Sequence, residues 1–363
     1  MAEKEVKLMK GNSDSPCGDS LRLRRIFRVP DHSPVGSDGD TDGTQAVGDH
    51  GHGRAAGRIG DLVDQHGLRR RIDRKTGDDL VVEPRHQPDV GGAELPGGGG
   101  TALPGDQLPA RRPGLGTIQP SQGDYFQACK GGGHGDFHMI VLAPNSVQEM
   151  HDHVAEAFDL AFKYRNPAMI LADGAIGQMM EKVVLAPQRP RKTDEEIAAE
   201  CRSWATYGKP ADRKRNIVTS LELQSEKMEI INKRLQEKYK ALEENEVRYE
   251  EIGCDDADYV IVAFGSSARI CSATVEMARA EGLKVGLLRP ITLYPFPKKP
   301  LAELAARGVK GFLSAELNAG QMVEDVRLAV NGVAPVEHFG RQGGMMFAPD
   351  EVLAALKEKL IKK

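Results

Sequence analysis

The chain has few cysteines and no long apolar run, and each shortage excludes a class of protein. Its 5 cysteines among 363 residues are far apart, so no CxxC pair is present to hold zinc or an iron–sulfur cluster. We interpret them as scattered reduced thiols. No stretch approaches the roughly 20 apolar residues of a membrane-spanning helix. The opening, MAEKEVK, lacks the apolar core of a signal peptide.

A strong excess of charge of either sign is also missing. The net charge is −4, with 28% charged and 40% hydrophobic residues. This balance gives no basic field for nucleic acid or an anionic membrane, so we expect neither as a partner and expect a cytoplasmic protein. At 363 residues the chain exceeds what one hydrophobic core usually serves, which predicts two domains.

Residues 13–111 differ in composition from everything that follows. They contain 18 Gly and 12 Arg but 1 Lys and a single aromatic residue, Phe27, whereas residues 112–363 contain 18 Lys, 15 Arg and 17 aromatic residues. Low apolar density with frequent glycine predicts disorder, because too little surface can be buried to offset chain entropy. Gly, Arg, Ala and Pro also have GC-rich codons, and off-frame translation of a GC-rich gene produces this bias.

From Pro113 onward the pattern is periodic. Residues 137–143 form an apolar run, and Ser146 with Glu149 three residues later is typical of a helix start. The expected helix has one apolar face until Asn166-Pro167; the face comprises Val147, Met150, Val154, Phe158, Ala161 and Phe162. Residues 168–172 read as a second buried strand. This strand-helix-strand order predicts a parallel α/β layer with a site at the carboxyl ends of the strands.

Residues 187–253 read as a linker that contains a long amphipathic helix. Its apolar stripe, which we interpret as a packing face, consists of Met228, Ile231, Leu235, Tyr239 and Leu242.

A second α/β unit is expected from residue 254 onward. The predicted strands are 259–264, 284–288 and 309–314, with helices after Gly265, around 323–330 and from about 349. The Gly265-Ser-Ser267 turn either grips an anion through free backbone amides or simply connects strand to helix, and we favour the plain connection.

Several long motifs resemble the alpha subunit of 2-oxoacid:ferredoxin oxidoreductases of the branched-chain type. They are 113–127 (PGLGTIQPSQGDYFQ), 130–136 (KGGGHGD), 171–174 (LADG), 177–180 (GQMM), 288–297 (LRPITLYPFP) and 316–322 (ELNAGQM). Residues 8–12 (LMKGN) also look like the family's opening. The resemblance covers about 113–363 and the first dozen residues.

The resemblance implies an α/β protein with a pyrimidine-type thiamine-diphosphate-binding domain and a transketolase C-terminal-like domain. We therefore expect a native-like start at 1–12, an aberrant low-order segment at 13–112, the rest of the thiamine domain at 113–186, the linker at 187–253 and the second domain at 254–363. In the family, thiamine pyrophosphate is shared with a partner subunit and does the chemistry on the 2-oxoacid, whose electrons pass through iron–sulfur clusters to ferredoxin while coenzyme A takes the acyl group.

The same resemblance implies partners: a beta subunit that binds the coenzyme's phosphates and an iron–sulfur cluster, a gamma subunit, a ferredoxin-like delta subunit, and ferredoxin. Mg²⁺, the iron–sulfur cluster and coenzyme A are expected on those partners or on the assembled complex. In this chain the cofactor-binding candidates are Gly114, Gly116, Gln119, Ser121, Gln122 and Asp124. The glycines let the backbone approach a ligand and the polar side chains offer hydrogen bonds, although holding the loop as turn and cap residues is an equal alternative.

Three further residues are candidates for the site. His134, between glycines, is a candidate for substrate binding or acid–base work, but a lone loop histidine usually does neither. Glu316 and Asn318 follow a strand, where they reach an interface or, more economically, cap the next helix. We assign no catalytic residue and no metal ligand.

The chain departs from the family within 13–111. By resemblance, the family's Tyr-Pro-Ile-Thr-Pro turn, its pyrimidine-contacting glutamate and its Arg-Gly-Gly-Pro arginine all fall there, and Ala110 holds the arginine's place. With suitable codons, a one-base shift turns residues 103–113 into CPAINCPRGGP, which continues directly into Gly114. The same shift turns residues 22–37 into a family-like sequence and residues 57–67 into a Ser/Thr-rich run. We hypothesise a compensated frameshift between about residues 13 and 113.

The function expected from the resemblance is oxidative decarboxylation of 2-oxoisovalerate to its acyl-CoA. Three alternatives stay open: a 2-oxoglutarate:ferredoxin oxidoreductase subunit, an inactive frameshifted subunit that only docks partners, and a different thiamine enzyme such as a transketolase-like or 1-deoxyxylulose-type synthase.

Overall fold

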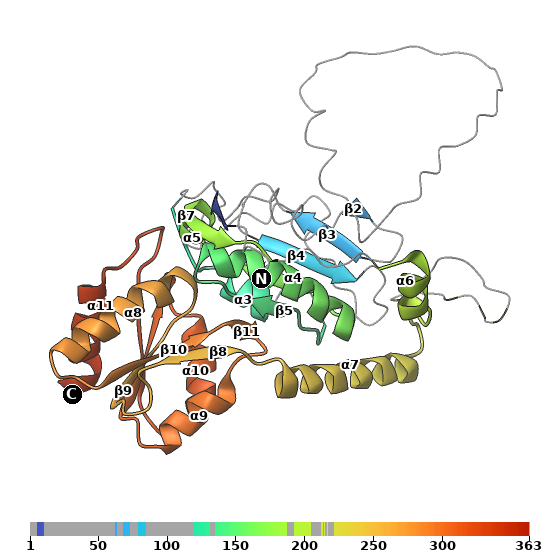
Figure 1. Ribbon diagram of the computed structural model, residues 1–363. Coiled ribbons are helices and arrows are strands. Elements are labelled where there is room, and N and C mark those ends of the chain that lie inside the picture. Colours follow the sequence, from blue (N-terminus) through green and yellow to red (C-terminus); the bar gives the residue numbers. More distant parts are fainter. Residues whose placement is uncertain are drawn as a thin grey trace, which may run out of the picture.

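The structure is a computed structural model. It describes residues 6–10, 119–130, 135–186, 192–204, 212, 214, 216 and 221–362, together with the backbone of 62–63, 68–72 and 79–84. Figure 1 shows two α/β units joined by a long helix. Within the described residues, no helix combines the length and the apolar character that crossing a membrane requires.

The first unit is built on a mixed sheet. Strands β5 (Ile140–Leu142) and β6 (Ala168–Leu171) pair in parallel. The backbone of β4 (Asp79–Pro84), β3 (Leu68–Ile72) and β2 (Leu62–Val63) extends the sheet from β6 in antiparallel pairing. The expected parallel layer is therefore confirmed for β5 and β6, whereas the outer strands run antiparallel. The rest of segment 13–112 lies outside the described residues.

Helix α4 (Val147–Tyr164) connects the two parallel strands as predicted. The Ser146 hydroxyl accepts from the Glu149 amide, which is the predicted cap. Five of the six predicted apolar positions are buried, and Phe162 is half-buried. The helix ends at Arg165 in the left-handed conformation, φ 48°, just before Asn166-Pro167.

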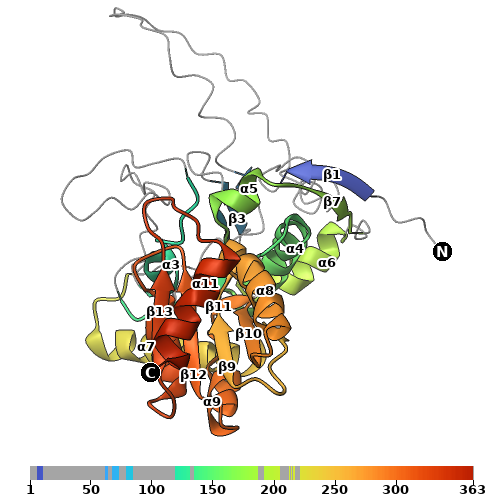
Figure 2. The ribbon, with the colours of Figure 1, turned by 90° about the vertical axis from the view of Figure 1, so that its left-hand side faces the viewer.

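A smaller two-stranded ribbon lies beside α4. Helix α5 (Gly174–Gln178) leads into β7 (Met180–Val184), which pairs antiparallel with β1 (Val6–Lys10). Met9, Val183 and Leu185 pack with Val147 of α4 in a small apolar cluster. The start of the chain is thus tied to the first unit, at its outer edge in Figure 2.

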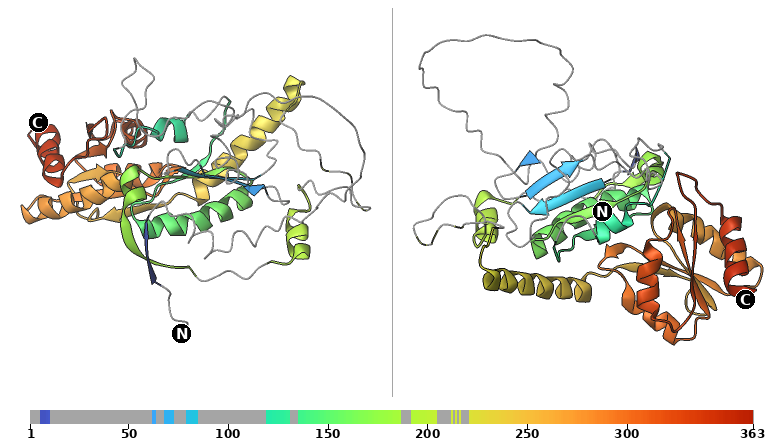
Figure 3. Two further views of the ribbon diagram at one scale, coloured as in Figure 1. Left: turned by 90° about the horizontal axis from the view of Figure 1, so that it is seen from above. Right: turned by 180° about the vertical axis from the view of Figure 1, so that it is seen from behind.

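The connection between the units contains helices α6 (Asp194–Cys201) and α7 (Ser225–Asn245). Leu235, Tyr239 and Leu242 of the predicted α7 stripe enter the main core, while Met228 and Ile231 are half-buried. Both views of Figure 3 show α7 extending away from the second unit alongside the first. The packing face is therefore confirmed for the carboxyl-terminal half of the helix.

The second unit is a five-stranded sheet between two pairs of helices. Its strand order is β13-β12-β9-β10-β8, with only β8 antiparallel. The elements are β8 (Tyr249–Ile252), β9 (Tyr259–Val262), α8 (Gly265–Ala280), β10 (Val285–Pro290), α9 (Lys298–Ala306), β12 (Gly311–Glu316), α10 (Met322–Val330), β13 (Val336–Gly340), α11 (Pro349–Leu356) and the π-helical turn η1 (Lys357–Ile361). The predicted second α/β unit is confirmed.

Strand alternation divides this unit's core into two layers. Val260 and Phe312 belong to the main cluster, while their chain neighbours Ile261 and Leu313 pack on the opposite face with α8 and α11. A further strand, β11 (Thr292–Tyr294), leaves the second unit and pairs antiparallel with β5 of the first. One core cluster consequently runs through both units.

Candidate active site region: the joint between the two units

Gln122 connects the candidate loop to the second unit. Its side-chain amide donates to the Phe264 carbonyl at 2.8 Å, and its side-chain oxygen accepts from the Ser267 hydroxyl at 2.7 Å and the Leu317 amide at 3.1 Å. The Gln122 carbonyl also accepts from Asn318 at 2.8 Å. Because Phe264 and Leu317 follow β9 and β12, the loop lies at the carboxyl ends of the second sheet, as expected for a site in an α/β fold.

Asp173 joins the same region from the first unit. It follows β6, and one carboxylate oxygen accepts from the Ala175 and Ile176 amides at the start of α5. The other accepts from the Ser266 amide of α8 at 3.0 Å. A carboxylate is favourable at this helix start, where free amides and the helix dipole point.

This contact favours the plain connecting role of the Gly265-Ser-Ser267 turn over phosphate binding, because the Asp173 carboxylate already takes the Ser266 amide. Gly265 has φ +56°, and a Cβ there would lie 2.9 Å from Gln122 Nε2 and 3.0 Å from Asp173 Oδ2. Glycine is needed because the two partners from the first unit approach so closely.

Glu316 is fully buried and caps α10. Its carboxylate accepts from the amides of Gln321, Met322 and Val323 at 2.7 to 3.0 Å, and from the Ser314 hydroxyl at 2.8 Å. The capping role weighed from the sequence is therefore the one observed. Asn318 reaches the interface instead, through Gln122.

We call the contacts of Gln122 and Asp173 with the second unit the joint. A buried phenol–carboxylate pair adds a further contact to it. Tyr125 of α3 (Tyr125–Cys129) donates to Asp325 of α10 at 2.6 Å, and Lys130 contacts the other Asp325 oxygen at 2.7 Å. Burial raises the pKa of Tyr125 well above its usual value, and the adjacent Asp325 carboxylate adds to the effect. Tyr125 thus stays a neutral donor across the physiological pH range.

Arg289 forms a further polar link between the units. It lies in β10, and its guanidinium binds both carboxylate oxygens of Glu149 at 2.8 Å and contacts Glu250 at 2.8 Å. Burial raises the pKa of Glu149, but Arg289 and the Asn145 amide together outweigh burial and hold that pKa below 4.5. The bidentate geometry fixes the first turn of α4 against β10.

The predicted cofactor-binding residues differ in the contacts that they make within the chain. Ser121 donates to the Leu317 carbonyl at 3.4 Å and Gln122 has the contacts above, so both serve the joint. Gln119 is exposed, and Asp124 precedes α3 without a side-chain cap bond. Gly114, Gly116 and His134 lie outside the described residues.

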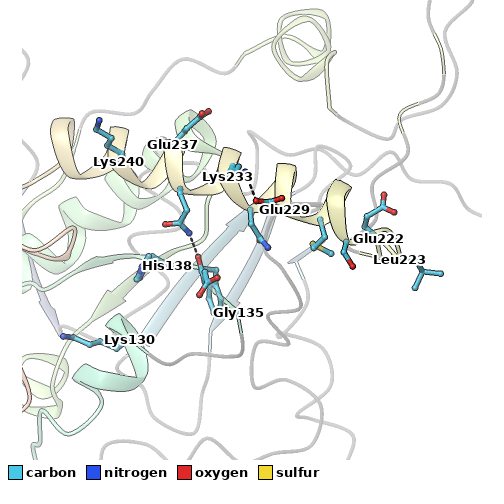
Figure 4. Close-up of a pocket in the computed structure, with 15 residues that line it drawn as sticks. Lys130, Gly135, His138, Glu222, Leu223, Glu229, Lys233, Glu237 and Lys240 are labelled. Atoms are coloured by element: carbon cyan, nitrogen blue, oxygen red, sulfur yellow. Dashed lines mark hydrogen bonds and ion pairs between the residues drawn. The ribbon is translucent and has the colours of Figure 1, made fainter.

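A separate open cavity of about 1150 Å³ lies beneath the amino-terminal half of α7. Figure 4 shows His138 and Gly135 facing the helix across it, with Gln236 donating to the Asp136 carbonyl at 2.9 Å. Its lining mixes cations and carboxylates, and Lys233 pairs with Glu229 at 2.7 Å. Burial lowers the pKa of His138, which stacks on Tyr294 with ring centroids 4.3 Å apart.

The described cysteines are buried free thiols at positions 129, 201, 254 and 271. Burial raises the pKa of Cys254 to about 12, and it also raises the pKa values of Cys129 and Cys271. These three thiols are therefore poor nucleophiles. Cys17 lies outside the described residues.

Asp173, Tyr125 and Arg289 were not selected from the sequence. Asp173 follows a strand and precedes a helical Gly-Ala-Ile, which is a capping signal. Nothing local to Tyr125 or Arg289 indicates partners 200 and 140 residues away.

Replacing Asp173 with Asn tests the cap that the two helices share. We expect a loss of about 2 kcal/mol in the free energy of unfolding, because one oxygen becomes an amide that meets the Ser266 N–H donor to donor. Urea denaturation checks this, with the exposed Asp255→Asn as the matched control. A loss of less than about 0.5 kcal/mol, the range of ordinary surface substitutions, would contradict the shared cap.

Comparison with known proteins identifies the class of enzyme. The family model described as pyruvate flavodoxin/ferredoxin oxidoreductase, thiamine diphosphate-binding, matches residues 100–250, and pyruvate:ferredoxin oxidoreductase core domain II matches 257–352. Together with two α/β units joined at the strand ends, these matches define a thiamine-diphosphate-dependent enzyme of two α/β domains.

Individual relatives make the assignment narrower. Ketoisovalerate oxidoreductase subunit VorB of Methanothermobacter thermautotrophicus is 49% identical over 272 residues, which cover 74% of this chain and 72% of the relative. The chain belongs to the 2-oxoacid:ferredoxin oxidoreductase family. 2-Oxoglutarate synthase subunit KorA of Methanothermobacter marburgensis is 34% identical, over 65% of this chain and 68% of the relative.

A solved structure agrees on the fold. The 2-oxoglutarate:ferredoxin oxidoreductase of Magnetococcus marinus, solved with 2-oxoglutarate, coenzyme A and succinyl-CoA, superposes with a TM-score of 0.55 at 22% identity. The match covers 68% of this chain and 46% of that chain.

Proposed function

We propose that the chain is the subunit of a 2-oxoacid:ferredoxin oxidoreductase that acts on branched-chain 2-oxoacids, with 2-oxoisovalerate as the main substrate. The observation that carries this is the 49% identity to a ketoisovalerate oxidoreductase subunit, against 34% to a 2-oxoglutarate synthase subunit over a similar span. The reaction consumes 2-oxoisovalerate, coenzyme A and two oxidised ferredoxins, and yields the acyl-CoA, carbon dioxide, two reduced ferredoxins and one proton.

The coenzyme of the family is thiamine diphosphate. In the described part of the candidate loop, the side chains of Ser121 and Gln122 bond within the chain, and the Asp173 carboxylate accepts from three amides. These bonds support a loop-holding role for Ser121 and Gln122. Contacts by Gly114, Gly116, Gln119 and Asp124 stay predictions.

Partner subunits complete the proposal. Beta, gamma and ferredoxin-like delta subunits would supply the coenzyme's phosphate site with Mg²⁺, the iron–sulfur cluster and the coenzyme A site, and the complex would work in the cytoplasm. The relatives are themselves named as subunits, which supports a hetero-oligomer.

A comparison of the two substrates tests the proposal. The complex is purified with its partner subunits, and ferredoxin reduction is followed with 2-oxoisovalerate or 2-oxoglutarate at equal concentrations. A kcat/KM that favours 2-oxoisovalerate supports the assignment, whereas a preference for 2-oxoglutarate rejects it. Carbon–carbon ligation without ferredoxin reduction would place the chain among other thiamine enzymes.

A further inference from the structure

The ribbon formed by β1 and β7 packs one face against α4 and, among the described residues, exposes the other face. The covered face contributes Met9 and Val183 to the cluster on α4. Because side chains alternate along a strand, the other face presents six residues, which are Val6, Leu8, Lys10, Met180, Lys182 and Val184. We call these six residues the ribbon face.

Four of the six are apolar and exposed to solvent. Leu8 is 63% exposed, Met180 59%, Val6 54% and Val184 37%. Val6 and Val184 are direct cross-strand partners and Leu8 follows Val6 on the same face, so these three apolar groups adjoin, whereas Met180 lies beside Lys10 and Lys182. A two-stranded ribbon is marginally stable alone, and a contiguous apolar patch on it indicates an interaction surface.

The charges of the ribbon face indicate what kind of chain covers it. Both polar members are lysines, Lys10 and Lys182. Glu181 of β7 lies on the opposite face of the ribbon, where it accepts from the Val147 amide at 2.9 Å and pairs with Arg269 at 2.7 Å. A second copy of this chain would oppose lysines to lysines, which is unfavourable, whereas a different chain with carboxylates around an apolar centre is complementary.

We propose that the ribbon face docks another subunit of the same oxidoreductase, through an apolar patch bordered by carboxylates. This inference rests on the proposed function only in that the chain works in a complex. Figure 2 shows the ribbon at the outer edge of the first unit. Docking there would hold the start of the chain in place.

The test uses two independent changes in the full chain. Leu8→Ser with Val184→Thr removes apolar surface, and Lys182→Glu reverses a charge. Affinity for the purified partner subunits is measured by surface plasmon resonance. We expect each variant to bind at least about tenfold more weakly, a difference of about 1.4 kcal/mol. Exposed residues elsewhere give the controls: Leu328→Ser, 69% exposed on α10, and Lys299→Glu on α9.

The outcomes separate the alternatives. Wild-type affinity in both ribbon variants, or equal losses in the control variants, overturns the proposal.

Light scattering of the chain alone gives a second check, because a dimer that the ribbon substitutions dissociate would make the face a self-interface. Circular dichroism verifies folding, and Lys182→Glu keeps the test available if the double variant unfolds. An intact complex that fails to oxidise 2-oxoacids would reject the proposed function and leave the docking surface standing.

Discussion

Restoring the reading frame between codons 13 and 113 is expected to raise thiamine-diphosphate-dependent oxidation of 2-oxoisovalerate by at least about 100-fold. A positioned acid–base group contributes about 10² to 10⁴ in rate, and by resemblance the glutamate that contacts the pyrimidine ring falls within this segment. The only glutamates between 13 and 111 here are Glu83 and Glu94. Both versions are co-expressed with the partner subunits, and initial rates of ferredoxin reduction are compared with and without the coenzyme.

A synonymous recoding of the unrestored segment is the control, because it changes the gene without changing the protein. Binding to the partner subunits is measured in parallel, since the described second unit and joint are the same in both versions. Equal rates in the two versions would contradict the hypothesis. Sequencing the gene gives an independent check: an intact frame whose shifted codons encode nothing like the family would end it.

Local signals predicted the elements well where short-range chemistry decides them. Ser146 with Glu149 predicts the start of α4, and Asn166-Pro167 predicts its end, because capping and proline act within a few residues. The continuous apolar run 259–264 predicts β9. These features need no knowledge of distant parts of the chain.

Pairing between distant segments was not predictable in this way. Strand β11 pairs with β5 across about 150 residues of chain, in antiparallel register, and so ties the second unit to the first sheet. A parallel sheet is the natural expectation from a strand-helix-strand pattern. The antiparallel strands depend on contacts that the local pattern does not contain.

The candidate site shows the same division. Glu316 was correctly interpreted as a cap. Whether a loop glutamine faces a ligand or another part of its own chain depends on Phe264, Ser267 and Leu317, which are more than 140 residues away. Composition and spacing favour both roles equally, and the fold decides between them.

Replacing Glu316 with Ala is expected to lower the free energy of unfolding by about 4 kcal/mol. Hydrogen bonds to a charged group contribute about 1.5 to 3 kcal/mol each, and this substitution leaves three amides of the first turn of α10 without their acceptor in a fully buried position. Urea denaturation followed by circular dichroism measures the change.

Two companion variants show why the loss is attributed to the cap. Glu324→Ala removes an exposed carboxylate from the same first turn, and it should cost less than about 0.5 kcal/mol because its side chain lies in solvent. Glu316→Gln keeps one acceptor oxygen but loses the charge, so it should fall between the two. If Glu316→Ala unfolds like Glu324→Ala, the buried carboxylate does not organise the helix start, and the position of Asn318 and Gln122 beside it needs another explanation.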